Sequence, residues 1–197
     1  MKPPGDPLVA EKAALRRTVN ARRKALTADQ RAEEAAAVSV ALLAFLAETR
    51  PVAFASYLAM PDELDLAAVH RAWWAAGRAL YLPRVIGDGE LAWHAVTDAG
   101  QCRPGAFGIS EPDPATSLAV PLPTATLVLV PGVAFAADGG RLGRGRGFYD
   151  RVLAAHGGIS IGVGFACQQV IAVPGETHDR QVAAVLLGGH WLRQPQT

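Results

Sequence analysis

The residues best suited to chemistry form a basic, glycine-rich segment at positions 139 to 151, with the sequence GGRLGRGRGFYDR. Its glycines are interspersed with Arg141, Arg144, Arg146 and Arg151. Glycine lets backbone amides approach a ligand closely, amides ahead of a helix bind anions, and arginine forks match phosphate oxygens. The segment therefore predicts a triphosphate site, although it lacks the GxxxxGK pattern of a Walker A loop. GRGRG by itself is equally typical of a flexible, solvated turn.

A second basic set lies near the start of the chain. Lys12 and Arg16 are one helical turn apart, and Arg23 falls within about 40° of them at about 100° per residue. This stripe borders an apolar stripe on the same expected helix, made by Leu15, Val19 and Leu26. The spacing fits an anion-binding edge, and it fits an ordinary solvated basic face with packed side-chain stems as well.

Four carboxylates stand at positions where chemistry is feasible. Asp62 and Glu63 follow Pro61 between an expected strand and helix, Asp150 follows the glycine segment, and Asp179 lies in a late loop. Acids that face a helix dipole, or simple loop acids, explain each of them without any ligand. A carboxylate beside phosphate-binding amides would repel the phosphates, however, so Mg²⁺ between Asp150 and the ligand is the more economical explanation.

These residues need a scaffold, and hydrophobic periodicity predicts one. A helix is expected over residues 8–26, and a capping box at Thr27 and Gln30 starts a second helix that runs to about residue 48. Further helices are expected at 64–76, ended by Gly77, and directly after the glycine segment. Strands are expected at 52–58, 79–83, 91–96, 126–135, 159–166 and 182–187.

The alternation of strands and helices predicts a single α/β domain over residues 1–197, with a mostly parallel central sheet flanked by helices and an N-terminal helical pair. Residues 1–7 and 193–197 are expected to be flexible. Ligands bind beyond the carboxyl ends of such strands, which is where the glycine segment follows the apolar run at 126–135. The Pro- and Gly-rich stretch at 98–123 is expected to be a long functional loop.

Composition narrows the class of protein. The 197 residues are 50% hydrophobic and carry a formal net charge of +1, which argues for a packed domain and against a nucleic-acid binder. Cys102 and Cys167 show no metal-binding or disulfide spacing, and the five histidines show no catalytic triad. The N-terminal residues do not form a signal peptide, and no apolar run approaches the ~20 residues of a membrane span, so a cytoplasmic location is expected.

The segment PGVAFAADGGRLGRGRGFYDRVL resembles the motif of the 5-formyltetrahydrofolate cyclo-ligase family, P-G-x-x-F-D/T-x-x-G-x-R-L-G-x-G-x-G-Y/F-Y-D, from Pro131 to Asp150. KAALR, YLAMPDEL, FGISEP and ETHD extend the resemblance in order over nearly the whole chain. The chain departs from the family at Ala136 and Ala183, where Asp is common, and at Phe148, where Tyr is common.

The resemblance implies a Rossmann-like fold and ATP-dependent closure of 5-formyltetrahydrofolate to 5,10-methenyltetrahydrofolate, with Mg²⁺ at Asp150 and Asp179. Arg144 and Arg146 would neutralise phosphate charge in catalysis. The implied ATP-binding residues are Lys12, Arg16, Arg141, Leu142, Gly143, Arg144, Gly145, Arg146, Gly147, Phe148 and Tyr149. The implied folate-binding residues are Leu58, Met60, Glu63, Phe107, Arg144 and Phe148, with Glu111 orienting the loop that carries Phe107.

The implied partners are these small molecules only, with no nucleic acid and no membrane, and the chain is expected to be a monomer. Two alternatives stay open at this point. One is an enzyme that uses the loop for a single phosphate without ATP hydrolysis, such as a sugar-phosphate isomerase or an acyl-CoA-type transferase. The other is a non-catalytic paralogue that binds folate or nucleotide.

Overall fold

A computed structural model describes residues 6–87, 89–105, 108–175 and 179–195. Two long helices come first, α1 over Pro7–Ala25 and α2 over Ala28–Thr49. The expected capping box is confirmed: the Gln30 amide donates to the Thr27 hydroxyl at 3.2 Å, and the Thr27 amide donates to the Gln30 side chain at 2.9 Å. These bonds satisfy amide groups that the first helical turn leaves without partners.

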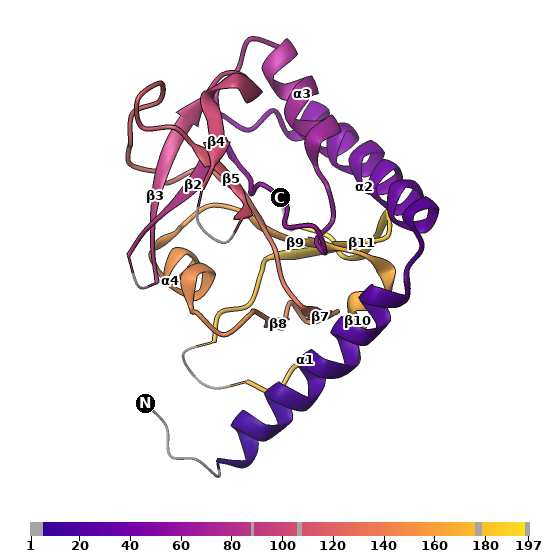
Figure 1. Ribbon diagram of the computed structural model, residues 1–197. Helices are drawn as coiled ribbons and strands as arrows, with labels where there is room; N and C mark the ends of the chain where they lie inside the picture. The colour runs from indigo at the N-terminus through magenta and orange to yellow at the C-terminus, as the bar shows by residue number, and fades with distance from the viewer. Residues whose placement is uncertain (1–5, 88, 106–107, 176–178, 196–197) are drawn as a thin grey trace.

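The centre of the molecule is a seven-stranded sheet with the order β12-β11-β9-β6-β1-β2-β3. Its strands β2, β3, β9 and β11 are labelled in Figure 1. The pairs among β11, β9, β6, β1 and β2 are parallel, and only the edge strands β3 and β12 are antiparallel to their neighbours. This confirms the expected α/β fold with a mostly parallel sheet. The strands are β1 Phe54–Ala55, β2 Leu80–Gly87, β3 Glu90–Val96, β6 Leu127–Val130, β9 Ser160–Gly164, β11 Ala184–Leu187 and β12 His190–Arg193.

The apolar run at 126–135 is not one central strand, as expected, but two. β6 ends at Val130, and after Pro131 and Gly132 the chain enters β7 (Ala134–Ala136) in a separate three-stranded sheet with β8 (Arg141–Leu142) and β10 (Gln169–Val170). Proline has no amide hydrogen for a sheet ladder. A Cβ at Gly132 would lie 2.6 Å from the Phe135 ring, so the turn also needs glycine. The glycine segment therefore begins on the small sheet.

The stretch at 98–123 is also more structured than a long loop. A 3₁₀ turn, η1 (Ala99–Gln101), leads into a two-stranded antiparallel hairpin of β4 (Cys102–Pro104) and β5 (Ser110–Pro112). The carbonyl of Pro112 accepts a 2.9 Å hydrogen bond from Arg84 of β2. Glu111 fastens the hairpin to the same strand, because its carboxylate accepts from the Val85 amide at 3.4 Å.

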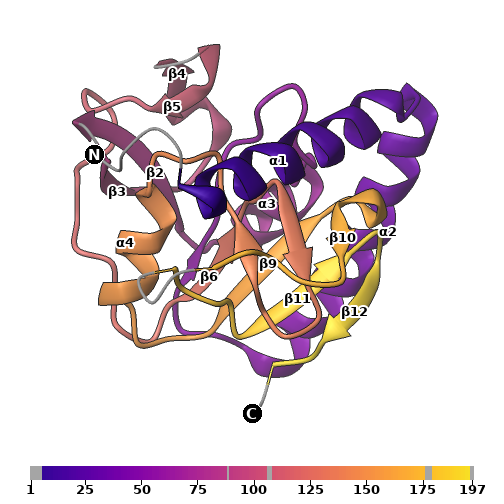
Figure 2. The ribbon, with the colours of Figure 1, turned by 90° about the horizontal axis from the view of Figure 1, so that it is seen from below.

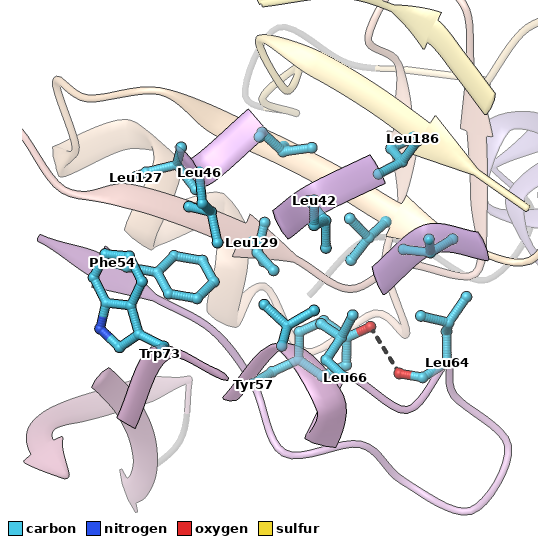
Figure 3. Close-up of a cluster of buried hydrophobic side chains, with 14 of the residues drawn as sticks. Leu42, Leu46, Phe54, Tyr57, Leu64, Leu66, Trp73, Leu127, Leu129 and Leu186 are labelled. Carbon is cyan, nitrogen blue, oxygen red and sulfur yellow. Dashed lines mark hydrogen bonds between the residues drawn. The ribbon is translucent and has the colours of Figure 1, made fainter. Parts of the chain in front are cut away.

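The sheet buries both of its faces. On one face α2 and α3 (Ala67–Ala75) cover a cluster that includes Leu42, Phe54, Trp73 and Leu129, and the Tyr57 hydroxyl donates to the Leu64 carbonyl at 3.2 Å (Figure 3). On the other face the residues that alternate with these along the strands, such as Val128, Val130 and Val185, face α4 (Phe148–Ala155). This alternation follows from the two-residue period of a strand.

Helix α1 does not cover the main sheet but packs on the small one (Figure 2). Val19 of α1 is fully buried with Val133, Ala134 and Leu142, and Leu15 packs against the same cluster. The helix that carries Lys12 is thereby fixed beside the glycine segment. Of the helices that the structure describes, none is both long and apolar enough to cross a bilayer.

The C-terminal part holds a strand that the sequence did not predict. β12 pairs antiparallel with β11 through a turn at Gly188 and Gly189, which both have positive φ. Arg193 ends this strand, and its guanidinium donates to the Asp138 carbonyl. Residues 193–197 were expected to be flexible, but Arg193 belongs to the sheet.

Candidate active site

The glycine segment forms a turn between β8 and α4. Gly145 and Gly147 have φ values of 96° and 69°, a region that side chains with a Cβ rarely adopt. Gly147 is also the N-cap of α4, and no side chain caps the helix there. The free amides of a helix start and the positive end of its dipole favour an anion at this point.

An apolar pocket of about 360 Å³ lies on one side of this turn. Its walls come from the segment after β1, the β2–β3 hairpin, the β5 region and the glycine segment. The lining side chains that are not part of the glycine segment include Tyr57, Leu58, Met60, Glu63, Val85, Leu91, Ile109 and Glu111. A mostly apolar cavity with a few acidic groups suits a flat, partly polar ring.

A basic groove of about 540 Å³ lies on the other side of the turn. The basic groove is lined from α1 by Lys12 and Arg16 and from α4 by Arg151, with Asp179 and Arg180 opposite. Both cavities share Arg141, Gly143, Gly145, Arg146, Gly147 and Asp150. The turn is therefore the place where a ligand of the apolar pocket and a ligand of the basic groove would meet.

The cations of α1 are tied to the groove by long-range contacts. The Lys12 ammonium lies 2.5 Å from the Asp179 carboxylate, and Arg16 Nε donates to the Gly143 carbonyl at 2.9 Å. Partial burial lowers the pKa of Arg16, while the nearby charge of Asp179 opposes that shift. The ammonium of Lys12 and the guanidinium of Arg16 are hydrogen-bond donors that can hold phosphate oxygens.

Arg141 is not an open loop residue. It lies in β8 with its side chain only 3% exposed, and its Nη2 donates to Asp150 Oδ1 at 2.6 Å. Its Nη1 donates to the Pro131 carbonyl at 3.3 Å, whereas its buried Nε has no acceptor among the described residues. This ion pair joins the small sheet to the first turn of α4.

Arg144 turns toward the apolar pocket. Its Nε donates to Glu63 Oε1 at 3.0 Å and its Nη2 donates to Asp62 Oδ1 at 2.7 Å. Burial opposes the charged guanidinium, but the two carboxylates outweigh it and raise the pKa of Arg144. The other oxygen of Asp62 pairs at 2.6 Å with Arg23, whose side chain is 1% exposed.

The sequence profile of the 5-formyltetrahydrofolate cyclo-ligase family matches residues 9–188. The chain belongs to this family. The match spans α1, the apolar pocket, the glycine segment and Asp179, so every part of the site described above lies within it.

Relatives of the cyclo-ligase family agree with this assignment. A 5-formyltetrahydrofolate cyclo-ligase of Haemophilus influenzae is 29% identical over 171 residues, which are 84% of this chain and 91% of that protein. The structure of Aquifex aeolicus 5,10-methenyltetrahydrofolate synthetase is 28% identical, covers 94% of this chain and 95% of its own, and has a TM-score of 0.79. A Mycoplasma pneumoniae synthetase, 21% identical, shares the fold with a TM-score of 0.67 over 89% of this chain and 97% of that one.

The structure separates the residues that the family resemblance assigned to ATP. The basic groove is lined by Lys12, Arg16, Arg141, Leu142, Gly143, Gly145, Arg146 and Gly147. The other three, Arg144, Phe148 and Tyr149, line the apolar pocket instead. Of the residues assigned to folate, that pocket gathers Leu58, Met60, Glu63, Arg144 and Phe148, whereas Phe107 lies outside the described residues.

The two aspartates assigned to the metal line the same groove, and Asp150 lines the apolar pocket as well. Each has a cationic partner, Arg141 for Asp150 and Lys12 for Asp179. Within the described part of the chain, no three His, Cys, Asp or Glu side chains gather as a metal cage. Mg²⁺ usually takes one or two carboxylates and completes its shell with phosphate oxygens and water, so this donor set fits Mg²⁺ that arrives with a nucleotide.

Several lining residues were missed from the sequence. Pro83, Val85 and Leu91 come from the β2–β3 hairpin, and Val85 lay between the expected strands because β2 continues to Gly87. Tyr149 was assigned to ATP, but it belongs to the apolar pocket, and its buried hydroxyl has no hydrogen-bond partner among the described residues. Burial, with the charge of Glu63 adding to it, raises the pKa of this phenol, so it is a hydrogen-bond donor at neutral pH.

Proposed function

We propose that this chain catalyses the ATP- and Mg²⁺-dependent closure of 5-formyltetrahydrofolate to 5,10-methenyltetrahydrofolate, with release of ADP and phosphate. The observation that carries the proposal is the pair of cavities that share one glycine-arginine turn. The apolar pocket suits the pterin and the basic groove suits the triphosphate. Their common wall brings a formyl oxygen and a terminal phosphate to the same place.

The reaction needs two steps. The N5-formyl oxygen attacks the terminal phosphorus of ATP, so that an O–P bond forms and ADP leaves. The N10 amine then adds to the formyl carbon and loses its proton, and the phosphate departs with the former formyl oxygen. Neither step needs a covalent enzyme nucleophile, so positioning and charge neutralisation are the tasks left to the protein.

Residues of the site divide these tasks. Glu63 offers acceptor oxygens to the amino edge of the pterin, while Leu58, Met60 and Phe148 provide apolar surface for the ring. Lys12, Arg16 and Arg146 hold phosphate oxygens in the groove, and the amides at the start of α4 add partial positive charge. Asp150 and Asp179 would hold Mg²⁺, which neutralises charge on the transferring phosphate when bound.

The test follows the absorbance of 5,10-methenyltetrahydrofolate after 5-formyltetrahydrofolate is added. One sample contains MgATP, a second contains ATP and a chelator of Mg²⁺, and a third contains no ATP. Product and ADP are expected in equal amounts only in the first sample. Turnover without ATP would contradict the proposal, as would binding of both ligands with no product. We also propose that the enzyme is a monomer, which sedimentation of the active protein tests.

A further inference from the structure

Arg144 occupies an unexpected position for a residue that neutralises phosphate charge. Its guanidinium contacts two carboxylates, Glu63 at 3.0 Å and Asp62 at 2.7 Å. It lines the apolar pocket, whereas its neighbours Gly143, Gly145 and Arg146 line both cavities. In this state the arginine is held away from the groove where the triphosphate would lie.

Asp62 is what fixes that position. One of its oxygens receives Arg144, and the other lies 2.6 Å from Arg23 Nη2. Arg23 also donates through Nε to the Asp62 carbonyl at 3.0 Å, and its side chain is 1% exposed. Asp62 is therefore anchored on a buried cation of α1. It lines neither cavity, so it is placed to act on Arg144 rather than on a ligand.

Both carboxylate oxygens of Glu63 already accept hydrogen bonds in this structure. Oε1 accepts from Arg144, and Oε2 accepts from the Met60 amide at 3.1 Å. A pterin amino edge presents donors that need such acceptors. When that edge takes Oε1, Arg144 loses one of its two carboxylate partners. The partner that remains, Asp62, already compensates the charge of Arg23.

We propose that Asp62 is a positioning residue: anchored by Arg23, it keeps Arg144 at the apolar pocket until the folate takes Glu63, and so couples folate binding to capture of the triphosphate. This inference rests on the proposed function. It explains how one arginine lines the folate side in the free protein and serves the phosphates in the complex. By linkage, nucleotide tightens folate binding by the same factor.

The coupling is modest in size because the contacts are partly solvated. The Arg144 side chain is 38% exposed and that of Asp62 is 42% exposed, and ion pairs at such sites are weak. We therefore expect folate to change the affinity for the nucleotide by about fivefold, which is the low end of the range usual for coupled sites.

The experiment measures binding of a non-hydrolysable ATP analogue with Mg²⁺ by calorimetry, with and without saturating 5-formyltetrahydrofolate. In the wild type the folate should tighten the analogue about fivefold. Asp62→Asn should tighten the analogue in the absence of folate by a similar factor and reduce the effect of folate. A purely structural role for Asp62 would give weaker binding, not tighter.

Two further variants complete the test. Asp65→Asn removes the same charge from the same segment, and its amide oxygen can still accept from the Ala67 amide as Asp65 does, so it should bind the analogue as the wild type does. Arg144→Gln should bind the analogue weakly and with no effect of folate, whether or not the Asp62 variant folds. Folate-dependent tightening that persists in Arg144→Gln would overturn the inference, and so would unchanged or weaker binding in a folded Asp62→Asn protein.

Failure of the proposed coupling can be distinguished from failure of the proposed function. If the wild type forms 5,10-methenyltetrahydrofolate but its affinity for the analogue does not respond to folate, only the coupling is wrong. If the wild type neither turns over nor binds 5-formyltetrahydrofolate, the proposed function itself fails.

Discussion

Asp150 forms an ion pair with Arg141, and we also propose it as a ligand of Mg²⁺, so one substitution should affect both stability and activity. Asp150→Asn removes a charge that we expect to contact Mg²⁺, and it also deprives Arg141 of its counter-ion at 2.6 Å. The Arg141 side chain is only 3% exposed, so its guanidinium would lose this partner in a site that water barely reaches. We therefore expect Asp150→Asn to lose stability as well as activity.

The size of the stability loss follows from burial. Removing one partner of a fully buried pair costs about 3 to 5 kcal/mol. Asp150 is 27% exposed, so water can replace part of the lost contact, and we expect about 2 to 4 kcal/mol. For a chain of this length that corresponds to a fall in Tm of about 5 to 15 °C.

The assay is thermal unfolding followed by circular dichroism for Asp150→Asn, Arg141→Gln and the double variant. Because the two side chains act as a pair, the single losses should not add, and the double-mutant cycle should show a coupling of about 1 to 3 kcal/mol. Asp138→Asn is the matched control. Its side chain accepts from the Gly140 amide at 2.7 Å, which asparagine can still do, so its stability should change by less than about 0.5 kcal/mol.

The proposed role of Asp150 as a Mg²⁺ ligand is measured on the same proteins. At a temperature where Asp150→Asn is folded, its Mg²⁺ concentration for half-maximal turnover should rise, because a charged oxygen ligand has been lost. A variant with wild-type Tm would refute the argument from the buried ion pair. A variant with an unchanged Mg²⁺ requirement would remove Asp150 from the metal site.

Three further predictions test other parts of the molecule. MgATP should slow tryptic cleavage after Arg144 and Arg146, because both exposed arginines lie in a glycine turn that a bound triphosphate would order; equal cleavage rates with and without MgATP would count against that turn as the nucleotide site. Lys12→Ala should raise KM for ATP more than KM for folate, and Glu63→Gln should do the reverse. Each variant should lower kcat/KM for the affected substrate by roughly ten- to a hundredfold. Equal effects on both substrates would contradict the division between groove and pocket. His70 is buried against the Ser56 hydroxyl at 2.8 Å, and burial lowers its pKa from 6.5 to about 4. As the pH falls, His70 therefore binds a proton in the unfolded chain before it does so in the folded chain. About 3 kcal/mol of stability should be lost as the pH falls from 6.5 to 4. In His70→Gln the dependence of the unfolding free energy on pH over that window should be flatter.

Local patterns in the sequence predicted the elements that depend on local physics. The capping box at Thr27 and the helix end at Gly77 need only neighbouring residues, and both stand where they were expected. The apolar run at 126–135 could not be divided from hydrophobicity alone, since one long strand and two short ones have the same composition. The signal for the division was Pro131 followed by Gly132, a pair that removes a ladder donor and permits a close approach.

Partners far apart in the chain could not be predicted. Arg23 belonged to a basic stripe at the edge of α1, yet its side chain is buried because Asp62, 39 residues away, compensates its charge. Arg144 likewise turned to the carboxylates of Asp62 and Glu63 rather than to the groove. A stripe on a helical wheel shows which residues share a face, but it says nothing about which charge another segment brings to that face.

The contact between Lys12 and Asp179 has a consequence for synthesis of the protein. Their separation of 167 positions means that the basic groove joins one of the first helical turns to a loop that is translated late. When the ribosome has released residues up to about 150, α1 and the glycine turn exist but the carboxylate opposite Lys12 does not. At about 5 to 20 residues per second, roughly 1.5 to 6 seconds pass before Asp179 follows. A nascent chain therefore cannot assemble the whole groove before Asp179 is made, and the nucleotide that we propose for this groove could assist folding only after that point.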